Sequence, residues 1–165
     1  MMTGRFWVQI VSDDRQLERA RDWAQRFHAG QVDKLGRPYI DHVSDVAQRA
    51  SLHGHEAEIV AWLHDIVEDT PVTLAEIEET FGQTIREGVE GMTRRAGEDY
   101  FDDYLPRLQH NALARIVKLA DMQHNMAKLD DLCAVNPEDA KRLAEKYARA
   151  MAFLTGAVIH TGSQT

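Results

Sequence analysis

The most chemically informative part of the chain is residues 62–70, Trp-Leu-His-Asp-Ile-Val-Glu-Asp-Thr, which set a His-Asp pair and two further carboxylates in an apolar stretch. A helix here would bring His64 close to Glu68, because helical neighbours lie three and four residues apart. It would bring Asp65 close to Asp69 for the same reason. Burying several carboxylates together is costly, and a bound cation would offset that cost. The alternative is that these carboxylates lie at an exposed acidic helix end, with one histidine whose ring makes its hydrogen bonds inside the protein.

Two other stretches place side chains of the metal-binding type in apolar helices. His42 ends the sequence Tyr-Ile-Asp-His at the start of one expected helix, and Asp121 ends Lys-Leu-Ala-Asp within another. With His64 and Asp65 they form a set of two histidines and two aspartates. Imidazole and carboxylate ligands without a thiolate suit Mn, Fe, Mg or Zn, and the hard oxygen donors favour Mn or Fe.

A divalent ion held by these residues would polarise a phosphoryl oxygen and lower the pKa of its water, which makes a nucleophile near neutral pH. Glu68 and Asp69 lie about one helical turn from the expected ligands, where they can position that water or carry its proton.

Each residue also has an interpretation that involves no ligand. His42 could be an exposed histidine at a helix start. Asp121 could pair with Lys118 or Lys128 on its own helix, and Asn125 could be a surface amide. The three segments nevertheless belong to separate apolar helices that must pack together, and this favours a common site.

Composition limits the class of protein. The chain has 165 residues, 44% of them hydrophobic, which suits one soluble domain with a real core. Its formal net charge of −8 argues against general nucleic-acid binding, which relies on Lys and Arg, but allows a small polyanionic substrate.

Cys133 is the only cysteine, so no intrachain disulfide can form, and a cytoplasmic location is expected. We see no signal-peptide pattern and no apolar run that would span a bilayer, and nothing specifies an oligomeric state.

The hydrophobic pattern predicts an all-α fold, a single helical bundle over residues 1–165 with its core at about 12–160. Residues 5–11 alone have strand-forming character, and Ser12 is expected to be the N-cap of the first helix, which ends at Gly30. Thr73 and Glu76 are expected to form a capping box. The further helices are expected at about 40–53, 55–68, 73–82, 84–91, 99–108, 111–129 and 136–159, the last one capped by Asn136 with Pro137 at its first position.

Several motifs, in order and spacing, resemble the HD-domain metal-dependent phosphohydrolases over about residues 17–130. The similarity is strongest to the hydrolase domain of RelA/SpoT homologues, especially the small stand-alone alarmone hydrolases of the metazoan SpoT-homologue type. The motifs are Pro-Tyr-Ile-Asp-His at 38–42, Leu-His-Asp-Ile-Val-Glu-Asp-Thr at 63–70, Phe-Gly at 81–82, Gly-Met-Thr at 91–93, Val-Lys-Leu-Ala-Asp at 117–121 and His-Asn-Met at 124–126.

This resemblance implies removal of the 3′-pyrophosphate from guanosine tetra- or pentaphosphate, which gives GDP or GTP and pyrophosphate, usually with Mn²⁺. It implies a single metal on His42, His64, Asp65 and Asp121, with Glu68 and Asp69 as the catalytic acidic residues. Asn125 matches an asparagine that contacts the nucleotide, and Lys34 matches the lysine of an Arg-Lys pair that precedes Pro-Tyr-Ile. Lys118 could contact a phosphate group. Tyr147 either lines the nucleotide pocket or is a core residue.

The chain departs from the family pattern near the base. Asp33 stands where the arginine that packs on guanine is usual, and a carboxylate cannot stack as a guanidinium does. Met122 and Ala127 replace residues that are commonly basic. Two alternatives therefore stay open: hydrolysis of another nucleotide or phosphoester, and nucleotide binding without hydrolysis.

Overall fold

The computed structural model describes the backbone of residues 5–156 and the side chains from residue 14. Within that range the chain is helical, as the sequence predicts, and its only β-type pairing is an isolated bridge between Val32 and Pro38. The elements are α1 (Arg5–Phe27), α2 (Tyr39–Ala50), the 3₁₀ turn η1 (Ser51–His53), α3 (His55–Leu63), α4 (Ile66–Asp69), α5 (Leu74–Phe81), α6 (Gln83–Met92), the π-helical turn η2 (Tyr100–Tyr104), α7 (Leu105–Gln109), α8 (Ala112–Ala127), α9 (Leu129–Val135) and α10 (Pro137–Thr155).

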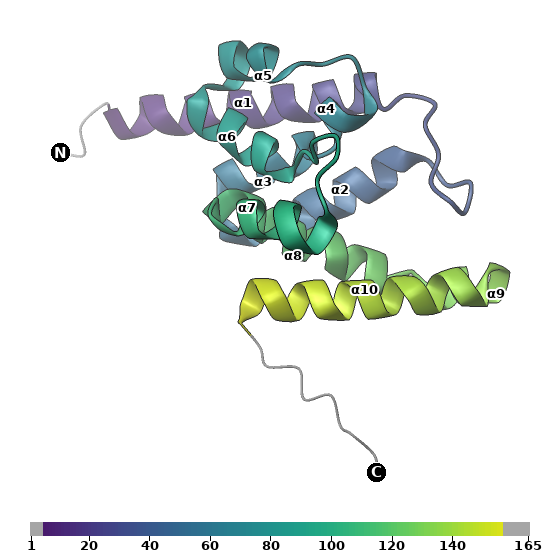
Figure 1. Cartoon of the computed structure of the whole chain (residues 1–165). Helices are drawn as coiled ribbons and strands as arrows, with labels where there is room; N and C mark the ends of the chain where they lie inside the picture. Colours follow the sequence, from purple (N-terminus) through teal and green to yellow (C-terminus); the bar gives the residue numbers. More distant parts are fainter. Residues whose placement is uncertain (1–4, 157–165) are drawn as a thin grey trace.

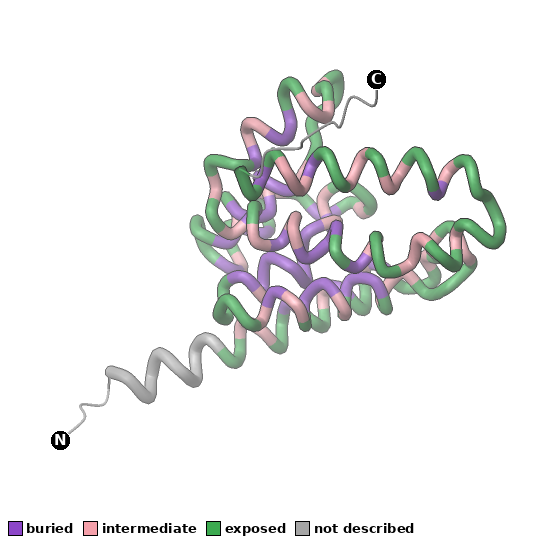
Figure 2. Tube along the Cα trace, turned by 90° about the horizontal axis from the view of Figure 1, so that it is seen from below, coloured by how far each residue is buried: buried purple, intermediate pink, exposed green. Residues whose placement is uncertain are grey.

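Helix α3 forms the centre of the bundle. It contacts α1, α2, α6 and α8, and its residues 59–63 are all buried. α1 lies along one side of the molecule and α10 along the opposite side, next to α8 (Figure 1). Figure 2 shows the buried residues gathered in the middle of the bundle, as expected for a helix that is apolar almost all round. None of the described helices is both long and apolar enough to cross a membrane.

Two glycines let α6 approach its neighbours closely. A methyl group at Gly88 would lie 2.7 Å from Cγ2 of Val60 on α3, and one at Gly91 would lie 2.6 Å from Cβ of Ala114 on α8. Both distances are shorter than van der Waals contact, so a larger residue would push α6 away from the centre of the bundle.

Most of the expected helices are present, and their caps explain their ends. The capping box between Thr73 and Glu76 is formed, and Asn136 accepts a hydrogen bond from the Asp139 backbone with Pro137 in the first turn. The last helix ends at Thr155, earlier than expected, because Gly156 takes a left-handed conformation with φ of 71°. The expected residues 157–159 of this helix lie outside the described range.

Three expectations about helix boundaries are wrong. α1 begins at Arg5, so residues 5–11 form no strand and Ser12 does not begin the helix. A helix satisfies its own backbone hydrogen bonds, whereas a lone strand has no partner here. α9 lies between the helices expected at 111–129 and 136–159, where no helix was expected. The central helix stops at Leu63 and restarts at Ile66, with Asp65 between them at φ −107° and ψ 0°.

Candidate functional site

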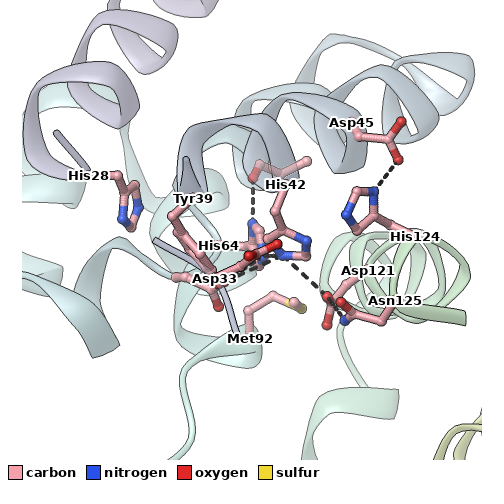
Figure 3. Close-up of polar contacts among 12 residues, drawn as sticks. His28, Asp33, Tyr39, His42, Asp45, His64, Met92, Asp121, His124 and Asn125 are labelled. Atoms are coloured by element: carbon pink, nitrogen blue, oxygen red, sulfur yellow. Dashed lines mark hydrogen bonds and ion pairs between the residues drawn. The ribbon is translucent and has the colours of Figure 1, made fainter. Parts of the chain in front are cut away.

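The side chains expected to bind a metal meet at one point (Figure 3). The Nε2 atom of His42 on α2 lies 3.3 Å from Nε2 of His64, and Nε2 of His64 lies 2.8 Å from Oδ2 of Asp65. These three residues form a group that could hold an ion. Asp121 on α8 completes the set, with Oδ1 3.5 Å from Nε2 of His42. The convergence of three separate segments is therefore present in the structure.

The break between α3 and α4 places two consecutive residues at this point. In a continuous helix, neighbours in the sequence point in directions about 100° apart, whereas here His64 and Asp65 contact each other. The Nδ1 atom of His64 lies 2.7 Å from the carbonyl oxygen of Ala61 and donates a hydrogen bond to it. This bond fixes the ring and leaves Nε2 directed at the cluster, which is the usual arrangement of a metal-binding histidine.

The charges of the cluster favour a bound cation. Burial lowers the pKa of His42 to about 4, so this imidazole is a neutral ligand at physiological pH. Burial also opposes a charge on His64, but the carboxylate of Asp65 outweighs it and raises the pKa of His64 to about 9. Asp65 is itself desolvated, yet His64 holds its pKa below the usual range. Without a metal, a proton therefore remains between His64 and Asp65, and a divalent ion would replace it.

Supporting residues surround the ligands that the sequence indicated. The hydroxyl of Tyr39 donates a hydrogen bond to Oδ2 of Asp65. The ring of His124 packs edge-on against His42, with 4.7 Å between the ring centroids. Nδ1 of His124 lies 2.5 Å from Oδ2 of Asp45, while its buried Nε2 has no hydrogen-bond partner among the described residues. Sequence reasoning gave these residues no role, although Tyr39 and His124 lie within the quoted motifs.

Asp121 is held in place by its own helix. Lys118 Nζ lies 2.9 Å from Oδ2 of Asp121, and the Asn125 side-chain amide donates to Oδ1 over 2.7 Å. The pairing of Asp121 with Lys118, considered above as an alternative to ligation, is thus present, and it leaves Oδ1 facing His42. Lys128 instead contacts Asp33, 3.1 Å away.

A pocket of about 440 Å³ opens over the cluster. His42, Asp65 and Asp121 lie in its wall. The expected substrate-binding residues Lys34, Lys118, Asn125 and Tyr147 all line it, together with Val32, Asp33, Leu35, Tyr39, Tyr100, Lys128, Leu129, Leu132, Leu143 and Lys146. The sequence thus identified a set of residues that share one cavity.

Lys34 lines this pocket but is paired with another residue. Its Nζ lies 2.8 Å from Oδ2 of Asp139 on α10, and its side chain is 64% exposed. A second ion pair, Arg37 with Asp131 on α9 at 2.8 Å, ties the same loop to the far side of the pocket. A contact between Lys34 and a substrate would therefore require the pair with Asp139 to open.

Glu68 and Asp69 lie beside the cluster rather than in the wall of this pocket. Glu68 accepts a hydrogen bond from the backbone N–H of Arg94 and lines a second, more open cavity of about 850 Å³ with the loop 93–99. Partial burial, and then the charge on Asp65, raises the pKa of Asp69. The pKa of Glu68 is also raised, chiefly by burial, in spite of the hydrogen bond from Arg94.

This fold and site define a class of protein. The family model described as HD domain matches residues 20–154, most of the chain, and the chain belongs to the HD-domain family. The particular relatives are named for one activity. A human protein named guanosine-3′,5′-bis(diphosphate) 3′-pyrophosphohydrolase MESH1 is 37% identical over 162 residues, which cover 88% of this chain and 86% of that protein.

Longer bacterial relatives carry the same name. The guanosine-3′,5′-bis(diphosphate) 3′-pyrophosphohydrolase of Haemophilus influenzae is 34% identical over 135 residues, 74% of this chain but 20% of that protein. The chain thus spans about a fifth of the length of such relatives. A solved structure, described as a metazoan orthologue of SpoT that hydrolyses ppGpp, has a TM-score of 0.69 at 21% identity and covers 84% of each chain, which shows the shared fold.

Proposed function

We propose that the chain is a metal-dependent hydrolase that removes the 3′-pyrophosphate from guanosine tetra- or pentaphosphate and yields GDP or GTP and pyrophosphate. The observation that carries this proposal is the convergence of His42, His64, Asp65 and Asp121 at a pocket of about 440 Å³, with three of them in its wall. The names of the relatives, above all the human protein of similar length, support the choice of substrate. The cytoplasmic location expected from the single cysteine belongs to the same proposal.

The four ligands would hold one divalent ion, for which we propose Mn²⁺ because hard oxygen donors accompany the imidazoles. The bound ion supplies a Lewis acid that polarises a phosphoryl oxygen and makes water more acidic. His64 contributes Nε2, since its Nδ1 is engaged with the Ala61 carbonyl. Asp121 contributes Oδ1, since Lys118 contacts the other oxygen.

Glu68 and Asp69 would position the attacking water and accept its proton on a carboxylate oxygen. Their raised pKa values suit this role, because a general base works best when its pKa is closer to the working pH. The N–H of Arg94 fixes the orientation of Glu68. A module that only binds nucleotide would not need this acidic pair beside its ligands, which argues against the non-hydrolytic alternative.

The remaining pocket residues would hold the nucleotide. Lys118 lies beside Asp121 and is placed to contact a phosphate group at the metal. Asn125 and Tyr147 line the cavity and would contact the nucleoside. Because Asp33 occupies the position of the usual base-stacking arginine, hydrolysis of another nucleotide or phosphoester is the second candidate.

The test is to incubate the purified Mn²⁺-loaded chain with guanosine tetraphosphate and to separate the products by chromatography. We expect equal amounts of pyrophosphate and GDP, loss of both in the Asp65→Ala variant, and normal turnover in Asp130→Ala, which removes an exposed carboxylate from α9. Orthophosphate from a mononucleotide, without pyrophosphate from guanosine tetraphosphate, would select the second candidate. Tight binding in calorimetry without any product would select the non-hydrolytic module.

A further inference from the structure

Two lysines of the pocket lie near the ring of Tyr100. The Nζ atom of Lys146 on α10 lies 3.9 Å from the centroid of this ring, and Nζ of Lys118 lies 6.0 Å from it. All three residues line the pocket of about 440 Å³. Both lysines therefore lie near Tyr100, and one of them, Lys118, also contacts Asp121.

The two lysines differ in how their charge is balanced. Lys118 is paired with Asp121 at 2.9 Å. In the part of the chain that the structure describes, no carboxylate lies within ion-pair distance of Lys146. Its contact is the face of Tyr100, which attracts a cation far less than a carboxylate does.

The surroundings of Lys146 are also positive. Burial, followed by the like charges of Lys118, Arg94 and Arg142, lowers the pKa of Lys146. The Arg94 guanidinium donates to the uncharged carbonyl oxygen of Glu98 and so keeps its net charge. A half-buried ammonium among other cations is unfavourable unless an anion joins them.

The proposed substrate brings such an anion, because it carries a phosphate chain on each side of its ribose. The chain that is cleaved must reach the ligand cluster, where Lys118 is placed to meet it. The other chain must lie elsewhere in the same pocket. Of the two lysines near Tyr100, Lys146 is the one that has no carboxylate partner among the described residues and so is free to meet this second chain.

We propose that Lys146, held over Tyr100, forms a second phosphate subsite that binds the 5′-phosphates of the substrate while its 3′-pyrophosphate lies at the metal centre. This subsite rests on the proposed function and makes it more specific. The substrate class is then a nucleotide phosphorylated at both ends, and a nucleotide with a free 5′-hydroxyl binds less well.

A substitution of Arg149, in the same helix, is a matched control for a purely structural role of Lys146. Arg149, one turn later, packs its guanidinium over Phe101 with 3.8 Å between Cζ and the ring centroid, and neither residue lines the pocket. Both contacts attach η2 to α10. Arg149→Gln therefore removes an equivalent cation–aromatic contact without removing a charge from the cavity.

The experiment compares steady-state kinetics of the wild type, Lys146→Gln and Arg149→Gln on two substrates, guanosine tetraphosphate and guanosine 3′-diphosphate with a free 5′-hydroxyl. For Lys146→Gln we expect KM for the tetraphosphate to rise about tenfold, as for loss of one charge-assisted hydrogen bond, with kcat within about twofold. KM for the 5′-hydroxyl substrate should not change. Arg149→Gln should leave both KM values unchanged.

Two results would overturn the subsite. An equal rise of KM for both substrates would show that Lys146 acts on the cleaved pyrophosphate, and no rise for either would leave it a structural contact. If the wild type hydrolyses neither substrate, the proposed function fails, and calorimetric titration of the metal-loaded protein with GDP still decides the subsite. Weaker GDP binding by Lys146→Gln than by Arg149→Gln would support it, and equal binding would contradict it.

Discussion

The ammonium of Lys128, the residue between α8 and α9, contacts the carboxylate of Asp33, with 3.1 Å between Nζ and Oδ2, and both residues line the pocket. The other oxygen of Asp33 accepts hydrogen bonds from the backbone N–H groups of Leu35 and Arg37, at 2.8 and 2.9 Å. Asp33 therefore organises the loop 31–38 and does not present an unpaired negative charge to the pocket.

Two substitutions at Asp33 separate its charge from its role in the loop. Asp33→Asn keeps an oxygen acceptor for the two N–H groups and loses the partly buried ion pair with Lys128, so we expect a change in KM of less than about fivefold. Asp33→Ala also loses both loop hydrogen bonds, at about 1 kcal/mol each, and should raise KM by about tenfold or more. Equal effects of the two variants on KM would show that the loop hydrogen bonds do not matter.

The pair of His64 and Asp65 makes metal binding depend on pH. His64, with its pKa raised to about 9, carries a proton at pH 7 in the metal-free protein, and a ligand must lose that proton. Metal affinity should therefore rise with pH, about tenfold per unit, until pH 9 is reached. His42, with its pKa lowered to about 4, releases no proton in this range. Calorimetry at pH 7 in two buffers of different ionisation enthalpy should show about one proton released per ion; no release would contradict the charge state assigned to His64.

Tyr39 should affect the metal through Asp65. Tyr39→Phe removes the hydroxyl that donates to Oδ2 of Asp65 and keeps the ring between His28 and His42. Loss of a hydrogen bond to a metal ligand commonly weakens metal affinity about tenfold or more. Titration with Mn²⁺ followed by electron paramagnetic resonance measures this change directly. An unchanged affinity, with an unchanged melting temperature, would remove Tyr39 from the group that supports the metal site.

The loop that orients Glu68 depends on the contact between Glu98 and Arg107. Two N–H groups of Arg107 contact the Glu98 carboxylate, at 2.7 and 2.8 Å, and lower its pKa from 4.5 to about 2. A carboxyl whose pKa is lower in the folded than in the unfolded protein stabilises the fold at pH values above its pKa in the unfolded protein. This stabilisation is lost as the pH falls through its pKa in the folded protein. The wild type should therefore lose stability between pH 4.5 and 2.

The variant Glu98→Gln tests this contact. It should have a lower melting temperature than the wild type at pH 7, and the difference should shrink at pH 3, where the carboxyl approaches protonation. Glu79→Gln, which changes an exposed carboxyl of α5, serves as the control. A difference that stays constant from pH 7 to pH 3 would mean that the charge of Glu98 contributes nothing.

Local rules account for what the sequence predicted well. The capping box of Thr73 and Glu76 and the cap at Asn136 depend on residues within one turn, so short-range pattern reading finds them. The convergence of His42, His64, Asp65 and Asp121 could also be predicted, because polar residues inside apolar helices are unusual and their burial demands a partner.

Long-range packing decided what the sequence did not predict. The break after Leu63 follows from contacts of Asp65 with Tyr39 and His64, and Tyr39 is 26 positions away along the chain. The pair of Lys34 and Asp139 joins residues 105 positions apart, so no periodicity within one helix indicates it. Such contacts depend on how the helices pack, which a local pattern does not contain.

The central claim is that His42, His64, Asp65 and Asp121 together hold one divalent ion. Anomalous diffraction from a crystal grown with Mn²⁺, recorded on both sides of the manganese absorption edge, tests it most directly. The account predicts one strong peak between the two Nε2 atoms and the two carboxylates, and its disappearance in Asp121→Ala. Absence of a peak there, or a peak bound only by residues outside this set, would contradict the account.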